Sequence, residues 1–98
     1  MKELPKEFEG RADQKSFRFR QLQRTETTAL YAKCLKSGKG SETYEVIRVR
    51  KRPAATVVRG GVSIDYEARE VFPSSEDWGT YAWTYNDLAE AKKRYYSL

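Results

Sequence analysis

The stretch Tyr44-Glu45-Val46-Ile47-Arg48-Val49-Arg50-Lys51-Arg52 predicts the strand around which the rest of the chain is organised. Its β-branched residues Val46, Ile47 and Val49 favour a pleated surface. Because side chains alternate between the two faces of a strand, Ile47 and Val49 are expected on a core face. Three basic side chains then line the opposite face: Arg48, Arg50 and Arg52. Guanidinium groups are not buried without partners, so this face is expected to meet water, carboxylates or phosphates.

The segment before this strand has the pattern of two further strands, or of one bent strand. Residues 17–20 alternate phenylalanine and arginine, so Arg18 and Arg20 are expected to share the face opposite to the rings. The apolar positions then change from odd to even numbers, which predicts a bulge or turn between residues 21 and 27. The glycines of Ser37-Gly38-Lys39-Gly40 predict a hairpin loop that leads into the central strand.

The clearest local pattern in the chain is a second hairpin after the central strand. Pro53 is expected to end that strand, because proline has no N–H to donate to a neighbour. Thr56–Arg59 and Val62–Tyr66 flank Gly60-Gly61, which is typical of a two-residue hairpin turn. Alternation along the outgoing strand places four apolar side chains on one face: Val62, Ile64, Tyr66 and Ala68.

The C-terminal quarter predicts a turn, a strand and a helix. Ser74 is expected to cap a single turn that ends before Gly79. Residues 80–85 predict a short strand with its aromatic side chains on one face. Asn86 is expected to cap a helix from Asp87 to about Tyr96. The apolar stripe of this helix is Leu88, Ala91 and Tyr95.

Together these patterns predict an α+β fold. We expect an antiparallel sheet of about four to five strands, arranged as a meander of hairpins, with one C-terminal helix packed on one face. At 98 residues the chain is long enough for one hydrophobic core. Residues 1–15 lack an apolar period and predict a flexible N-terminal arm, so residues 16–98 are expected to form the single domain.

The charges are distributed unevenly along the chain. The net charge is +5, but residues 1–52 hold fourteen Lys and Arg against seven Asp and Glu. A local basic excess attracts polyanions and speeds encounter with them. No apolar run is long enough for a membrane helix, and the N-terminus lacks the apolar core of a secretory signal. A single cysteine excludes an internal disulfide and fits the cytoplasm, which would be that of a host cell if the protein is phage-encoded.

The candidate binding residues are the basic positions of the predicted sheet and one tryptophan: Arg18, Arg20, Arg48, Arg50, Lys51, Arg52 and Trp78. Arginines on one sheet face can contact successive phosphates. The alternative is that Asp65 and Glu67 neutralise them across neighbouring strands. An aromatic row could likewise stack on bases or fill the core between sheet and helix. This row consists of Tyr81, Trp83 and Tyr85.

The residues of catalytic and metal sites are missing. Cys34 is the only cysteine and the chain has no histidine, which excludes a Cys-His dyad and a zinc site. The Glu76-Asp77 pair is explained by a helix start. Gly38-Lys39-Gly40 lacks the spacing and context of a phosphate loop. We therefore expect no enzyme, no cofactor and no metal.

Several short motifs resemble small proteins carried by phages and mobile elements. They are a Tyr-Glu-Val strand at residues 44–46, Glu-Asp-Trp-Gly at 76–79, Ala-Trp-Thr-Tyr at 82–85, and a following helix with Glu90-Ala91. The resemblance covers about half of the chain and implies a phage-like origin. It implies no activity and no binding residues.

We therefore expect a small non-enzymatic binding protein that engages nucleic acid or a nucleoprotein complex through a basic sheet face. The alternative is a protein–protein inhibitor or adaptor, such as a phage-encoded, anti-CRISPR-like antagonist of a host defence complex, with an exposed aromatic and arginine patch. A third hypothesis is an accessory protein that self-associates as a homo-oligomer through a sheet edge. None of the three involves a membrane.

Overall fold

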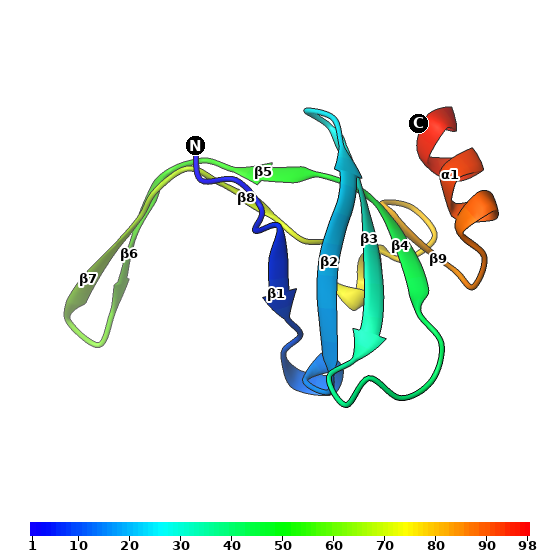
Figure 1. Ribbon diagram of the computed structural model, residues 1–98. Coiled ribbons are helices and arrows are strands. Elements are labelled where there is room, and N and C mark those ends of the chain that lie inside the picture. The colour runs from blue at the N-terminus through cyan, green and yellow to red at the C-terminus, as the bar shows by residue number, and fades with distance from the viewer.

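The computed structural model describes residues 1–98, apart from the side chain of Ser75. Five antiparallel strands form a sheet in the order β1-β2-β3-β4-β9, and the helix α1 packs on it (Figure 1). The predicted α+β class, antiparallel meander and single C-terminal helix are therefore confirmed. The elements of this body are β1 (Glu7–Glu9), η1 (Ala12–Gln14), β2 (Phe17–Arg24), β3 (Thr28–Leu35), β4 (Thr43–Arg48), η2 (Ser75–Asp77), β9 (Ala82–Tyr85) and α1 (Leu88–Ser97).

Two short ribbons extend away from this body. The first, here called the stalk, pairs β5 (Arg50–Arg52) with β8 (Arg69–Val71). The second, here called the arm, pairs β6 (Ala55–Arg59) with β7 (Val62–Tyr66) and forms the outer end of the projection (Figure 1). The predicted hairpin at Gly60-Gly61 is confirmed, with φ of 56° and 77°, values that favour glycine. This hairpin does not join the five-stranded sheet.

The prediction of one continuous strand over residues 44–52 is wrong, because the chain leaves the sheet at Val49. β3 begins at Thr28, which pairs with Arg48, so β4 has no further partner on β3 beyond that point. The Val49 amide donates instead to the Thr27 carbonyl at 2.8 Å. The next residues pair with β8 in the stalk. Arg48 and the pair Arg50 and Arg52 therefore belong to different ribbons and do not form one sheet face.

Both faces of the sheet are covered. On one face Ile47 is fully buried with Phe19 and Tyr31. On the other face Val46 is fully buried against α1. The central strand therefore has a core on each side, where the sequence predicted a core on one side only.

The residues of the predicted aromatic row lie in two different environments, one packed against α1 and one more exposed. Trp83 and Tyr85 pack in the cluster that includes α1, which confirms that they fill the space between sheet and helix. Tyr81 lies before β9 and is 37% exposed. On the reverse face Ala82 is fully buried in the other core.

The local predictions near the helix and the bulge hold closely. The pairing of β2 with β3 shifts register between Gln21 and Gln23, which confirms the bulge. Ser74 and Asp77 form a capping box at η2. The helix stripe is confirmed, with Ala91 and Tyr95 buried. Its cap is Asp87, whose carboxylate accepts from the Ala89 amide at 3.1 Å, and not Asn86.

The N-terminal segment contributes structure of its own. Residues 1–15, expected as a flexible arm, supply the edge strand β1 and bury Leu4 to 8% exposure. Their mobility remains a prediction. The Leu4 amide donates to the Glu70 carboxylate at 3.0 Å, and Arg24 donates to the same carboxylate at 2.7 Å and 2.9 Å. Glu70 thereby holds the N-terminal segment, β2 and the stalk together.

Glu70→Gln is expected to destabilise the protein near neutral pH by about 2–4 kcal/mol, because it leaves Arg24 without its charged partner. The Arg24 hydrogen bonds are the main reason why the pKa of Glu70 falls from 4.5 to about 2. This stabilisation is complete above the ordinary pKa and is lost as the pH falls toward about 2. Urea unfolding of the variant and the parent at several pH values measures the difference.

The matched control is Glu67→Gln, since Glu67 lies exposed and its carboxylate has no cation within 4.0 Å among the described residues. It should leave stability unchanged at every pH. If the cost of Glu70→Gln were the same at acidic and neutral pH, the assigned charge interaction would be refuted.

Candidate functional site

The structure separates the basic positions that the sequence grouped together. Arg18 and Arg20 lie on β2 and each has a carboxylate nearby: Glu9 at 3.9 Å and Glu42 at 3.5 Å, respectively. These pairs are exposed, so each contributes little to stability. Another anion can replace the carboxylate in either pair. The two arginines are thus available at the surface, although they are two strands away from β4.

The basic residues after β4 also find partners within the chain. Arg50 donates to both carboxylate oxygens of Asp77 at 3.2 Å and lies 4.8 Å from the centre of the Tyr81 ring. The Ser74 amide and, to a smaller degree, Arg50 lower the pKa of Asp77. Lys51 lies 3.5 Å from the Glu26 carboxylate. The acidic residues that neutralise this region are therefore different from the two that the sequence suggested.

Trp78 is half-buried and serves as a packing residue. Its Nε1 donates to the Thr84 hydroxyl at 2.7 Å, and its ring lies 6.1 Å from that of Phe72. Phe72 in turn packs edge-on against Phe8 at 5.4 Å. Only part of the indole surface is left for an external partner.

A different group of cations comes together in the stalk. Arg52 lies directly opposite Arg69 in the pairing of β5 with β8. Lys2 bridges to Arg69 from the other side, with the Lys2 amide donating to the Ala68 carbonyl at 2.9 Å and the Glu70 amide donating to the Lys2 carbonyl at 2.8 Å. Residues directly opposite each other point to the same face of a sheet. Lys2, Arg69 and Arg52 therefore form one row, here called the cation row, near the N-terminus in Figure 1.

The positive charge of the cation row is not neutralised by a nearby carboxylate in the described part of the chain. Among the described residues, no carboxylate oxygen lies within 4.0 Å of a side-chain nitrogen of Lys2, Arg52 or Arg69. Arg69 has other contacts, since it lies 5.0 Å from the centre of the Tyr66 ring and donates weakly to the Glu67 carbonyl at 3.5 Å. Like charges directly opposite each other destabilise a sheet. An external anion would relieve this repulsion.

Two members of the cation row were missed by the sequence analysis. Only Arg52 was among the predicted binding residues, while Lys2 fell in the expected flexible arm and Arg69 in the second hairpin. The sequence contained one usable signal, because Arg69 follows an alternating strand as its fourth outward residue. Nothing local indicated that Lys2 and Arg52 would lie on either side of it.

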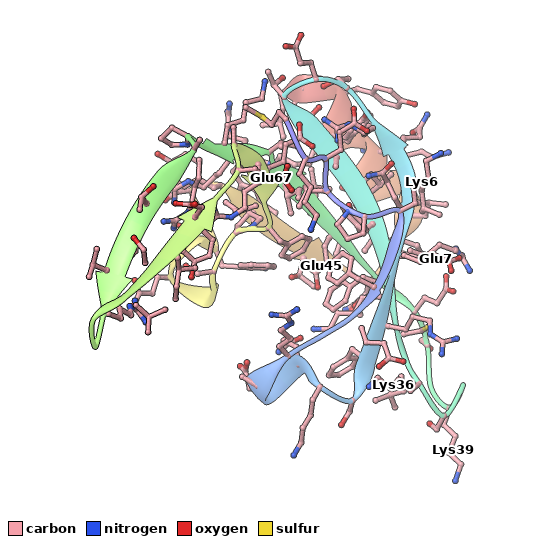
Figure 2. The ribbon with its side chains drawn as sticks, turned by 90° about the vertical axis from the view of Figure 1, so that its left-hand side faces the viewer. Lys6, Glu7, Lys36, Lys39, Glu45 and Glu67 are labelled. Carbon is pink, nitrogen blue, oxygen red and sulfur yellow. The ribbon has the colours of Figure 1, made fainter. Side chains whose placement is uncertain are left out.

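A groove of about 720 Å³ adjoins the cation row on the sheet face opposite α1. Lys2 and Arg69 contribute to its lining, together with aromatic side chains and Glu45. Glu45 is only 1% exposed, and Figure 2 shows it in the middle of the molecule, whereas Lys39 projects from an outer loop. The groove therefore has an apolar wall, the buried Glu45, and other charged side chains of both signs, since Glu3, Glu9, Asp13 and Glu70 line it as well as the cations.

The buried Glu45 has a complete set of partners. Its carboxylate accepts from the Thr84 hydroxyl at 2.5 Å and lies 3.7 Å from the Lys33 ammonium. Lys33 itself lies 4.2 Å from the centre of the Phe17 ring. Burial raises the pKa of Glu45, although its hydrogen bond from Thr84 and the charge of Lys33 oppose the rise. Among the described residues, every buried side-chain nitrogen and oxygen has a hydrogen-bond partner.

Because its carboxylate has these partners within the chain, the burial of Glu45 is explained by a structural role. No group of three or more Asp, Glu, Cys or His side chains in the described part of the chain could hold a metal ion. The absence of catalytic activity remains a prediction. Of the described helices, none has both the length and the apolar composition to cross a membrane.

Glu45→Gln is expected to make the stability difference from the parent depend on pH. Because the native pKa of Glu45 is raised, the parent binds its proton more readily when folded than when unfolded. The parent should therefore gain stability over the variant as the pH falls through the raised pKa, by at most about 1.4 kcal/mol per pH unit. Urea unfolding of both proteins between about pH 4 and pH 8 measures this difference. Parallel stability curves would show that Glu45 titrates normally.

No family model matches this chain, and neither a curated protein nor a solved structure does. Its function is therefore inferred from the charges and contacts of its own residues.

Proposed function

We propose that this chain is a non-enzymatic binding protein that engages nucleic acid through the cation row. The supporting observation is that Lys2, Arg69 and Arg52 stand side by side and have no carboxylate within 4.0 Å among the described residues. Such a row costs stability when it is empty. Phosphate oxygens supply the charge that the row lacks.

The dimensions of the row suit a phosphate backbone. Paired strands lie about 4.8 Å apart, so three neighbouring segments place their cations within about 10 Å. A nucleic-acid duplex carries about one negative charge per 1.7 Å of its axis. Long flexible side chains can therefore reach several phosphates at once. Contacts of this kind position the protein on the backbone and carry little sequence information.

The surrounding charges support the same partner. Arg48 is exposed at the end of β4 and Arg59 is exposed at the tip of the arm. Neither has a carboxylate within 4.0 Å in the described part of the chain. Arg48 is part of the excess of +7 in residues 1–52, and Arg59 adds to the positive field beyond the stalk. The proposal places the protein in the cytoplasm, which is the cytoplasm of a host cell if a phage encodes it.

The salt dependence of binding tests this proposal. The parent should bind a labelled oligonucleotide of about 20 base pairs, with an affinity that falls steeply between about 50 mM and 200 mM salt. The triple variant Lys2→Ala, Arg52→Ala, Arg69→Ala removes three phosphate contacts. It should flatten the slope of log affinity against log salt by roughly 2–3. Fluorescence anisotropy at several salt concentrations measures both slopes.

The control must carry the same loss of charge. Lys15, Lys39 and Lys92 are exposed lysines outside the stalk, and replacing all three by alanine lowers the net charge equally. This control should change the slope by much less than the variant of the cation row. Equal effects of the two variants would refute a specific role of the row, and no binding at low salt would refute the proposal itself.

A protein partner is the second candidate, and one observation favours it. Arg50 lies 4.8 Å from the Tyr81 ring, and Tyr81 is 37% exposed. Arginine and tyrosine are enriched in the central residues of protein interfaces. This inhibitor or adaptor hypothesis predicts capture of a host protein that survives nuclease treatment and is weakened by Tyr81→Ala.

A further inference from the structure

The arm is a two-stranded ribbon with an uncovered apolar face. Its cross-strand pairs place six side chains on one face: Ala55, Val57, Arg59, Val62, Ile64 and Tyr66. The other face holds Thr56, Val58, Ser63 and Asp65. On the first face Val62 is 61% exposed, Ile64 38% and Tyr66 41%. Figures 1 and 2 both show the arm standing apart from the body.

This exposure requires an explanation, because an isolated two-stranded hairpin is marginally stable in water. Exposed apolar side chains gathered on one surface mark an interaction site. The face is called here the apolar arm face. It is expected to be covered when the protein performs its function.

The charges around the apolar arm face indicate what kind of partner covers this face. Arg59 lies on the apolar arm face at the tip, and the cation row lies at the other end of the projection. The carboxylate nearest in sequence, Asp65, is on the opposite face and accepts a hydrogen bond from the Thr56 hydroxyl at 2.7 Å. The apolar arm face is thus bounded by cations at both ends and holds no acidic side chain. A partner with apolar surface between two rows of phosphates complements this arrangement.

Among nucleic acids, the shape of the arm favours a B-form duplex. The major groove of such a duplex is about 12 Å wide and admits a two-stranded ribbon, where apolar side chains contact thymine methyl groups. The corresponding groove of duplex RNA is too deep and narrow. From Arg52 to Arg59 the chain advances seven residues, or about 23 Å at 3.3 Å per residue, so base and tip reach separate phosphates.

Single strands fit less well, since their binding depends on exposed aromatic rings. Near the stalk such rings are used for packing, as in the stacked pair of Phe8 and Phe19 at 4.8 Å and the contact of Phe72 with Trp78 at 6.1 Å. On the arm only Tyr66 offers a ring.

We propose that the arm is a ribbon that enters the major groove of B-form duplex DNA, with Val62 and Ile64 against the base edges and Arg59 and the cation row on phosphates. This inference rests on the proposed function, since it names the form of nucleic acid that the same basic surface engages. It adds an apolar contribution that salt does not screen.

The variant Val62→Thr, Ile64→Thr tests this assignment. Threonine keeps the β-branched shape and strand preference, so the hairpin should be preserved while its apolar surface is reduced. Anisotropy is measured with a labelled duplex of about 20 base pairs, with its single strand and with the matching RNA duplex. The parent should bind the DNA duplex most tightly, and the variant should lose about tenfold in affinity for it.

The control is Val58→Thr, since Val58 is 69% exposed but lies on the opposite face. It should bind duplex DNA like the parent. Equal binding of all three nucleic acids, or equal effects of the two variants, would overturn the role of the arm while leaving the cation row in place. Failure of the parent to bind any of them would instead overturn the proposed function.

Light scattering tests whether a second copy of the chain, and not DNA, covers the apolar arm face. A monomer without DNA is expected for the parent. A dimer that Val62→Thr, Ile64→Thr dissociates would show that a second copy covers this face, and the assignment to DNA would be wrong.

Discussion

The shape of this protein depends on where the central strand finds its backbone hydrogen-bond partners. Buried and paired backbone groups must stay satisfied, and β3 offers partners to β4 only as far as Arg48. Beyond that residue the chain turns at Val49 and pairs with β8. The stalk and the arm exist because this transfer carries the chain off the sheet. The same transfer divides a basic stretch that looks continuous in the sequence.

The hydrogen bonds to the Glu70 carboxylate stabilise the segment that carries the cation row. This carboxylate accepts from the Leu4 amide and from two nitrogens of Arg24, which holds the first residues of the chain against β8. Lys2 is thereby kept beside Arg69, although the two side chains repel each other. The partly buried ion pair of Arg24 with Glu70 thus offsets the repulsion within the exposed cation row next to it. Repulsion that a fold tolerates at its surface is typical of a binding site for the opposite charge.

The body and the projection are built on different principles. In the body both sheet faces are covered, and even the buried Glu45 has its hydroxyl and ammonium partners. In the arm an apolar face is left open and only cross-strand pairs hold the two strands together. The body therefore supports the projection, which presents an uncovered apolar face together with the cation row. The proposed site of contact lies in the projection because uncovered apolar surface and, among the described residues, cations without carboxylate partners occur there together.

Local interactions determined much of the fold from the sequence alone. The turn at Gly60-Gly61, the bulge after Gln21, the capping box of Ser74 with Asp77 and the stripe of α1 each depend on residues only a few positions apart. The fold class follows from these elements. In the candidate site, sequence reasoning identified Arg52 but neither of its neighbours in the cation row. Lys2 and Arg69 meet across 67 positions of the chain, and Arg50 finds Asp77 across 27. Only the tertiary structure decides such contacts between distant residues, because the pairing of distant segments depends on which strand edges remain free after the body has formed.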